Sequence, residues 1–117
     1  MKIIIAGSRN FKDYQLLVRT MDKMTAKIPD VIVVCGGARG ADALGLRWAK
    51  DNEHQFRMFL PSWDVHGKSA GFIRNTEMAR YADALVAFWD GHSNGTAHMI
   101  MQAKKYKLKR KVVVYGD

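Results

Sequence analysis

Cysteine, proline and long hydrophobic runs are scarce in this sequence of 117 residues, which has one cysteine and two prolines. The lone cysteine, Cys35, excludes an internal disulfide and a four-cysteine zinc site, and its place in an apolar run is typical of a buried, unreactive thiol. No stretch approaches the roughly 18 apolar residues of a membrane-spanning helix. The apolar segment 3–6 is shorter than the core of a signal peptide, about 7–15 residues. We therefore expect a soluble, cytoplasmic protein with no membrane partner.

Acidic residues are also in the minority, with 11 Asp and Glu against 19 Lys and Arg and a formal net charge of +8. Such an excess suggests a nucleic-acid partner. Six of the positive charges lie in residues 104–111, however, and subtracting them leaves +2 on the rest of the chain. Cations are common at the end of a helix and on an edge strand, which they keep from pairing with another chain. Nucleic-acid binding through residues 104–111 is therefore an alternative that we do not favour.

Short β-branched runs alternate with helical patterns along the whole chain. The expected strands are residues 3–6, 31–35, 56–59, 84–89 and 112–115, and the expected helices are 13–27, 41–53, 68–81 and 96–106. Strands separated by helices of this length form a parallel sheet with crossover connections. We predict one α/β domain over residues 1–117, with a Rossmann-like, doubly wound, five-stranded sheet in the order 3-2-1-4-5 and helices on both faces.

A ligand binds such a sheet outside the carboxyl ends of its strands, at the point where the winding reverses. The predicted order places this point between the first and fourth strands, so the loops 7–11, 36–42 and 90–96 face it, with 63–75 as a rim. Glycines expose backbone amides, helix N-termini carry partial positive charge, and arginine binds phosphate through two hydrogen bonds. The candidate ligand-binding residues are Gly7, Ser8, Arg9, Gly36, Gly37, Arg39, Gly40, Asp42, Lys68, Asp90, Gly91, Ser93, Gly95 and Thr96.

Several polar residues near these loops have more than one interpretation. Asp42 either binds a ribose hydroxyl or caps its helix. Residues 67–69 are Gly-Lys-Ser but do not form a P-loop, because position 62 is serine where that motif needs glycine. Trp63, in a polar loop, is a candidate for stacking on a base. The four histidines lack the spacing of a helical metal pair, and we expect neither a metal nor a cofactor.

Four segments of the chain together resemble a known family: IIIAGSRNF, VVCGGARGAD, FLPSWDVHGKSAGFIRNTEMARYADALVAFWDG and SNGT. They are similar to the YspA-like (cpYpsA-related) branch of the SLOG superfamily. This superfamily of Rossmann-like domains includes the LOG (lysine-decarboxylase-like) nucleotide phosphoribohydrolases and the DNA-processing protein DprA. The resemblance extends over about residues 1–115. It implies that a nucleotide or nucleotide-derived ligand, such as an ADP-ribose-like molecule or a nucleoside monophosphate, binds in the crevice.

The phosphoribohydrolase relatives imply further site residues. Their R-K-x-x-M helix resembles residues 74–78, where Arg74 and Met78 match and Asn75 replaces the lysine. Their P-G-G-x-G-T loop resembles residues 90–96, and their glutamate follows two or three residues after the Gly-Thr pair. Here those positions are His98 and Met99, so the usual carboxylate is absent.

Other residues could supply the missing chemistry of these relatives. A neutral His98 could act as a base, and Asp90, Asp64 or Glu77 could take the place of the glutamate. Arg74 and Asp90 are the catalytic candidates, and Arg74 and Asn75 join the candidate ligand-binding residues.

The absent glutamate favours binding over catalysis. We predict a protein that binds a nucleotide-like small molecule as a sensor, sequestering protein or regulator. A nucleotide N-glycosidase of the phosphoribohydrolase type is the first alternative, and nucleic-acid binding through residues 104–111 is the second. Relatives often assemble through helix faces, so a homodimer is an open alternative to a monomer.

Overall fold

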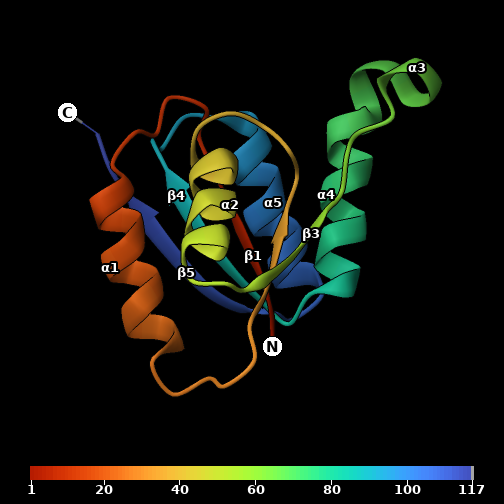
Figure 1. The fold of residues 1–117 in the computed structure, drawn as a ribbon. Helices are drawn as coiled ribbons and strands as arrows, with labels where there is room; N and C mark the ends of the chain where they lie inside the picture. Colours follow the sequence, from red (N-terminus) through yellow and green to blue (C-terminus); the bar gives the residue numbers. More distant parts are fainter. Residues whose placement is uncertain (117) are drawn as a thin grey trace.

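The computed structural model describes residues 1–116 and shows a parallel five-stranded sheet in the order β3-β2-β1-β4-β5 (Figure 1). Its strands are β1 (Lys2–Gly7), β2 (Ile32–Cys35), β3 (Gln55–Met58), β4 (Ala84–Trp89) and β5 (Lys109–Val114). Every neighbouring pair is parallel. The predicted α/β, Rossmann-like class and the order 3-2-1-4-5 are confirmed. A single domain over residues 1–117 stays a prediction, and residue 117 lies outside the described residues.

Four helices connect the strands: α1 (Tyr14–Thr25), α2 (Ala41–Asp51), α4 (Ala70–Tyr81) and α5 (Asn94–Lys105). α1 and α2 pack on one face of the sheet, and α4 and α5 pack on the other (Figure 1). Between β3 and α4 the chain adds a short helix, α3 (Trp63–His66), and a 3₁₀ turn, η1 (Gly67–Ser69). None of the helices in the described part of the chain has the length and apolar character needed to cross a membrane.

Alternate side chains of β1 supply two separate cores. Ile3 and Ile5 belong to the core under α1 and α2, whereas Ile4 and Ala6 belong to the core under α4 and α5. Successive side chains of a strand point to opposite faces, so a strand covered on both faces is apolar throughout. Full burial of each such isoleucine stabilises the fold by about 1.5–3 kcal/mol. The apolar sequence of β1 therefore positions its carboxyl end between two helical layers.

The last strand begins earlier than its apolar pattern predicts. The expected strand covers 112–115, but β5 begins at Lys109, which pairs with Ala84 of β4. Lys109, Arg110 and Lys111 are exposed on this edge of the sheet. The length of this edge strand is set by its backbone pairing with β4, whereas the pattern of apolar side chains indicates only which residues are buried. The apolar pattern therefore did not predict that the exposed residues 109–111 belong to the strand. The position agrees with a role of these charges in protecting the edge.

Two helix starts differ by two residues from the sequence prediction. The expected helix 68–81 begins at Ala70, because Gly67 ends α3 with a φ of 56° and the chain turns before α4. The expected helix 96–106 begins at Asn94, two residues earlier. Both differences lie next to glycines. Because glycine adopts helical and non-helical backbone conformations with similar ease, the sequence pattern does not define where the helix starts. The later start of α4 leaves residues 63–69 to form α3 and η1 as a separate rim.

Helix α2 packs closely on β1 through a glycine. A Cβ added to Gly45 would lie 2.6 Å from Cγ2 and 2.8 Å from Cβ of Ile5. Gly45→Ala should therefore destabilise the protein by about 1–3 kcal/mol, because overpacking outweighs the gain in helix propensity. The control, Gly95→Ala in α5, has no atom within 4 Å of the new Cβ and should stabilise by about 0.5–1 kcal/mol. Urea denaturation measures both, and stabilisation by Gly45→Ala would contradict the packing.

Candidate functional site

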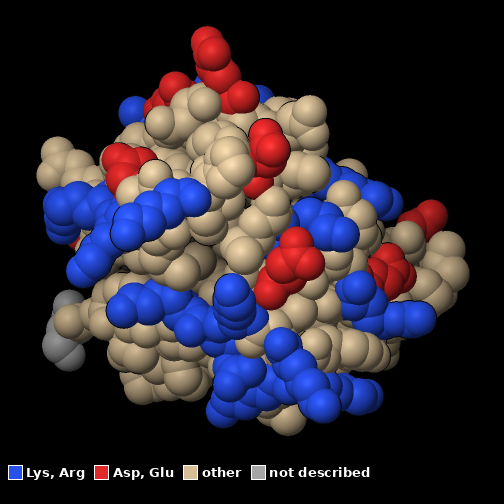
Figure 2. Space-filling model, turned by 90° about the horizontal axis from the view of Figure 1, so that it is seen from below, with Lys and Arg blue, Asp and Glu red and all other residues tan. Residues whose placement is uncertain are grey.

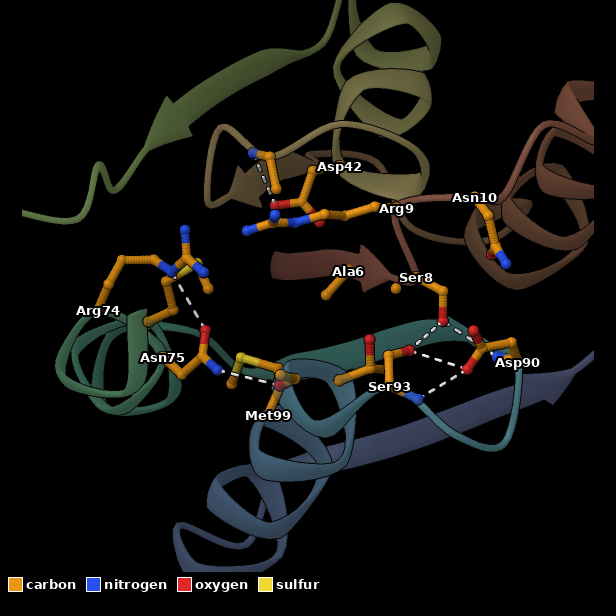
Figure 3. A pocket seen from close by; sticks show the side chains of 15 residues that line it. Ala6, Ser8, Arg9, Asn10, Asp42, Arg74, Asn75, Asp90, Ser93 and Met99 are labelled. Atoms are coloured by element: carbon orange, nitrogen blue, oxygen red, sulfur yellow. Dashed lines mark hydrogen bonds between the residues drawn. The ribbon is translucent and has the colours of Figure 1, made fainter. Parts of the chain in front are cut away.

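A cavity of about 380 Å³, which we call the inner cavity, lies where β1 and β4 end (Figure 3). Ala6 of β1 forms part of its floor, with Arg9 and Asp42 on one side and Ser93 and Met99 on the opposite side. Its position is the switch point that the strand order predicts. Its lining consists of Ala6, Gly7, Ser8, Arg9, Asn10, Ala38, Asp42, Arg74, Asn75, Met78, Asp90, Ser93, Gly95, Thr96 and Met99.

A second cavity of about 580 Å³, which we call the outer cavity, adjoins the inner one on the side of α3 and α4. The two cavities share the lining residues Arg9, Ala38, Arg74, Asn75 and Gly95. Its remaining lining consists of Gly36, Gly37, Arg39, Leu60, Pro61, Trp63, Lys68, Gly71 and Phe72. Together the cavities form one elongated site with the two arginines in its shared wall.

Two consecutive residues of α4, Arg74 and Asn75, connect the loops on either side of the site. Nη1 of Arg74 donates a hydrogen bond to the carbonyl oxygen of Gly36 at 2.6 Å, and its Nε donates to Oδ1 of Asn75 at 3.2 Å. Nδ2 of Asn75 donates to the carbonyl oxygen of Gly95 at 3.2 Å. A Cβ at Gly36 would lie 2.4 Å from Nη1 of Arg74, so glycine leaves the space that the guanidinium occupies. This chain of bonds fixes the loop after β2 against the first turn of α5.

Asp42 is a buried carboxylate in the first turn of α2. Its Oδ2 accepts hydrogen bonds from the amides of Gly36 at 3.0 Å and Ala38 at 3.4 Å. Burial raises the pKa of Asp42, while the positive charge of Arg74 and the two amides act in the opposite direction. Burial also lowers the pKa of Arg74, and Asp42 opposes that change. Asp42 therefore organises the glycine-rich loop; its contact with a ribose hydroxyl stays a prediction.

Ser8, Ser93 and Asp90 form a closed set of hydrogen bonds at the other end of the inner cavity. The Ser93 hydroxyl donates to Oδ1 of Asp90 at 2.9 Å, so the Ser8 hydroxyl is the donor in its 2.5 Å contact with the Ser93 hydroxyl. The Asp90 amide donates to Oγ of Ser8 at 3.1 Å. Oδ1 of Asp90 also accepts from the amides of Ser93 and His92, and these bonds hold the pKa of Asp90 well below its usual range. Asp90 therefore stays ionised at neutral pH and does not serve as a proton donor.

Two helices begin at the inner cavity without a side-chain cap. α2 starts after Gly40 and α5 starts after Ser93, and neither start has a side-chain hydrogen bond to the first amides. The first amides of a helix have no partner within the helix and carry partial positive charge. Asp42, Gly95 and Thr96, from these two first turns, line the cavity. Their backbone amides are the kind of donor that binds a phosphate.

The two residues that replace the relatives' glutamate lie in different places. Met99 lines the inner cavity, whereas His98 lines neither cavity. The ring of His98 stacks on Phe72 with centroids 4.2 Å apart, and its Nδ1 lies 3.2 Å from Nδ2 of Asn75. Burial lowers the pKa of His98, so a neutral ring accepts this hydrogen bond from Asn75. His98 thus supports Asn75 from behind.

Of the three carboxylates that could replace the relatives' glutamate, only Asp90 lines a cavity. Among residues 1–116, Asp42 and Asp90 line the inner cavity, whereas Asp64 and Glu77 line neither cavity. The same residues hold no group of three His, Cys, Asp or Glu side chains arranged for a metal ion. Cys35 is buried at the end of β2, and burial raises its pKa to about 11. Its thiol is therefore protonated at neutral pH and unreactive.

The fold brings almost all candidate ligand-binding residues to the two cavities. The exceptions are Gly40, which directly precedes α2, and Gly91, which lies in an exposed turn with a φ of 85°. Whether the remaining residues contact a ligand stays a prediction. The lining residues outside the candidate ligand-binding set are Ala6, Asn10, Ala38, Leu60, Pro61, Trp63, Gly71, Phe72, Met78 and Met99. Met78 and Met99 stand at positions that the resemblance to the phosphoribohydrolases singles out, but their helical spacing is that of ordinary core residues and does not predict a cavity wall.

Asp90→Asn should destabilise the protein at about pH 7, because the carboxylate loses charge-assisted hydrogen bonds from His92 and Ser93. The pKa of Asp90 is lower in the folded protein than its ordinary value of 3.8. Its stabilisation is therefore full above that value and is lost as the pH falls toward the folded pKa. Thermal denaturation should show a smaller difference between wild type and variant at about pH 3 than at about pH 7. Equal differences would contradict this, and Glu77→Gln, at an exposed position of α4, is the control.

Comparisons of the sequence and the structure with known proteins identify similar proteins. The model of the YspA, cpYpsA-related SLOG family matches residues 1–66. Gene 61 protein of Mycobacterium phage D29 is 37% identical over 123 residues, which cover 99% of this chain and 97% of the phage protein. DNA processing protein A from Helicobacter pylori, whose structure was described for its single-stranded DNA binding mode, has a TM-score of 0.75 and 19% identity. That match covers 99% of this chain but only 66% of the other chain, and it shows the fold alone.

The family model covers more than half of the chain and includes the loops after β1 and β2. The phage relative extends the similarity over nearly the whole length. The resemblance that the four sequence segments indicate is thereby confirmed. The chain belongs to the YspA, cpYpsA-related SLOG family.

Proposed function

We propose that the inner cavity binds the phosphate-bearing part of a nucleotide or nucleotide-derived small molecule, and that the protein acts as a sensor, sequestering protein or regulator. The ligand classes we favour are nucleoside monophosphates and ADP-ribose-like molecules. One observation carries the proposal. The uncapped first turns of α2 and α5 and the side chains of Arg9 and Arg74 meet at one cavity. Both kinds of group favour an anion.

The charges around the cavity indicate where the phosphate lies. Arg9, Arg74 and Gly95 belong to the wall that the two cavities share, whereas the ionised Asp90 lies at the opposite end of the inner cavity (Figure 3). Repulsion from Asp90 disfavours an anion at that end. The phosphate is therefore expected near the shared wall, within reach of the first amides of α5.

Asp42 suits a sugar on the inner side of the phosphate, such as the second ribose of an ADP-ribose-like ligand. The amides of Gly36 and Ala38 both donate to its Oδ2. Within the described residues Oδ1 has no such donor, and Asp42 lines the inner cavity. A carboxylate oxygen accepts a hydrogen bond from a ribose hydroxyl. The cavity volumes, about 380 and about 580 Å³, lie in the range of small-molecule sites, roughly 300–1,000 Å³.

Glycosidic-bond cleavage has less support than binding. Such cleavage requires a protonated acid or a carboxylate placed beside the scissile bond. The inner cavity holds two carboxylates, but the loop after β4 occupies Oδ1 of Asp90 with three hydrogen bonds, and the glycine-rich loop occupies Oδ2 of Asp42. Incubation with a nucleoside monophosphate tests this alternative directly, since an N-glycosidase releases free base.

Arg74→Ala should weaken the binding of adenosine monophosphate by roughly 12-fold to 150-fold, because a charged hydrogen bond to phosphate contributes about 1.5–3 kcal/mol. Isothermal titration calorimetry measures the affinity. Arg80→Ala, at an exposed position in the last turn of the same helix, is the matched control and should leave it unchanged. Arg74 also holds the Gly36 carbonyl, so the exposed Arg9 is a second target whose loss should leave the fold intact. Unchanged affinity in both Arg74→Ala and Arg9→Ala would refute the proposed site.

A second candidate function is binding of single-stranded nucleic acid at the opposite end of the molecule. Figure 2 shows Lys and Arg side chains outnumbering Asp and Glu on the face seen from below, where the strands begin. Lys104, Lys105, Lys107 and Lys109 are exposed at this end, at the end of α5 and the start of β5. The DNA-binding protein from Helicobacter pylori shares the fold. Such a basic surface attracts phosphates regardless of sequence.

Replacing Lys107, Lys109 and Arg110 by glutamine tests this candidate. If these residues contact a single-stranded oligonucleotide, affinity falls and the slope of log K against log salt decreases by about 0.7 for each lost phosphate contact. Fluorescence anisotropy with labelled oligothymidylate at several salt concentrations measures both. Arg19→Gln, at an exposed position in the middle of α1, is the control. An unchanged affinity and slope would exclude the basic end as the binding surface.

A further inference from the structure

The outer cavity carries an unusual amount of exposed apolar surface. Trp63 of α3 is 54% exposed, Phe72 of α4 is 48% exposed and Leu60 after β3 is 65% exposed, and all three line this one cavity. Water contact of large apolar side chains is unfavourable by about 25 cal/mol per Å². Their concentration around a concave site is typical of a binding surface.

The apolar side chains of the outer cavity lie against residues of α4, α5 and the glycine-rich loop. One face of the Phe72 ring stacks on His98 at an interplanar angle of 17°. Trp63 lies next to Gly71, where an added Cβ would be 3.7 Å from its ring. Leu60 packs on the glycine-rich loop, since a Cβ on Gly37 would lie 2.6 Å from its Cδ2. The outer cavity is therefore built onto the same loop that closes the inner cavity.

The charged residues of the outer cavity are all cationic. They are Arg9, Arg39, Lys68 and Arg74, and its lining includes no Asp or Glu. An apolar group that entered this cavity would therefore be favoured if it were attached to an anion. An aromatic base linked through a sugar to a phosphate has this chemistry, and the shared wall with Arg9 and Arg74 gives the phosphate its place.

We propose that the outer cavity is the base-binding subsite, in which an aromatic base stacks on Trp63 beside Phe72 while its phosphate lies at the shared wall. The proposal rests on the proposed function and assigns the second half of the ligand. A free nucleotide and a nucleotide unit of a single-stranded nucleic acid share this chemistry. The subsite makes the base a contributor to affinity, where the inner cavity alone would recognise only sugar and phosphate.

The test compares ribose 5-phosphate with adenosine monophosphate by calorimetry on the wild type and on Trp63→Ala. Stacking of one base on an aromatic side chain contributes about 1–3 kcal/mol, so the base should strengthen wild-type binding by roughly 5-fold to 150-fold. Trp63→Ala should remove most of this gain and leave the affinity for ribose 5-phosphate unchanged. Tyr106→Ala, at an exposed aromatic residue just after α5, is the matched control.

The fluorescence of Trp63 gives a second readout. Adenosine monophosphate should quench part of the wild-type emission, and this quenching should be lost in Trp63→Ala although Trp48 and Trp89 remain. Trp63 is more than half exposed, so its replacement should not unfold the protein. Equal affinity for the two ligands in the wild type would overturn the base subsite and leave the phosphate site standing. Binding of neither ligand would overturn the proposed function and the subsite with it.

Oligothymidylate and thymidine monophosphate distinguish the two sources of the base. If the occupant is a free nucleotide, Trp63→Ala weakens the monophosphate and leaves oligothymidylate binding unchanged. If the occupant is a unit of nucleic acid, Trp63→Ala weakens the binding of oligothymidylate. The size of this effect is then compared with that of replacing Lys107, Lys109 and Arg110 by glutamine. Either result supports a base subsite. No effect of Trp63→Ala on any of these ligands would refute it.

Discussion

Two neighbouring strands that send the chain to opposite faces of the sheet create the site. After β1 the chain leads to α1 on one face, and after β4 it leads to α5 on the other (Figure 1). Both strands are buried on both faces, so neither can shift to close the opening between the diverging loops. The inner cavity follows from this topology. It also explains why the first turn of α5, the loop after β1 and the start of α2 reach one place from distant parts of the sequence.

Helix α4 converts this opening into a defined site. Arg74 bonds the loop after β2, and Asn75 bonds the first turn of α5, so one turn of helix connects both sides. The ring of His98 accepts a hydrogen bond from Asn75 and stacks on Phe72, which also lines the outer cavity. The same short segment therefore positions phosphate-binding groups and aromatic walls. A ligand that spans the two cavities would meet cations in the middle and polar and aromatic surfaces at its two ends.

The sequence predicted the sheet order and most of the loops of the site, because buried parallel strands are apolar throughout and glycine marks the turns beside them. It could not show that Arg74 lies against Gly36, since 38 residues separate them and only packing of α4 joins them. It left Asp42 between two roles, and the structure shows its contacts with the loop amides. It placed Met99 at the position of the relatives' glutamate but did not predict a cavity wall there, because a methionine at helical spacing is the same signal in a core and in a cavity wall.

The net charge of +8 also shows which properties the sequence determined and which the tertiary structure decided. The sequence by itself determined how many charges there are, that six lie in residues 104–111, and that the sheet would be parallel and buried. Only the tertiary structure decided that Lys109, Arg110 and Lys111 are paired within the edge strand, away from the cavities, and that Arg9 and Arg74 lie in a wall shared by two cavities. The physical reason is that periodicity encodes which face of an element is buried. Convergence of side chains depends on which elements become neighbours, and that is set by the packing of the whole sheet.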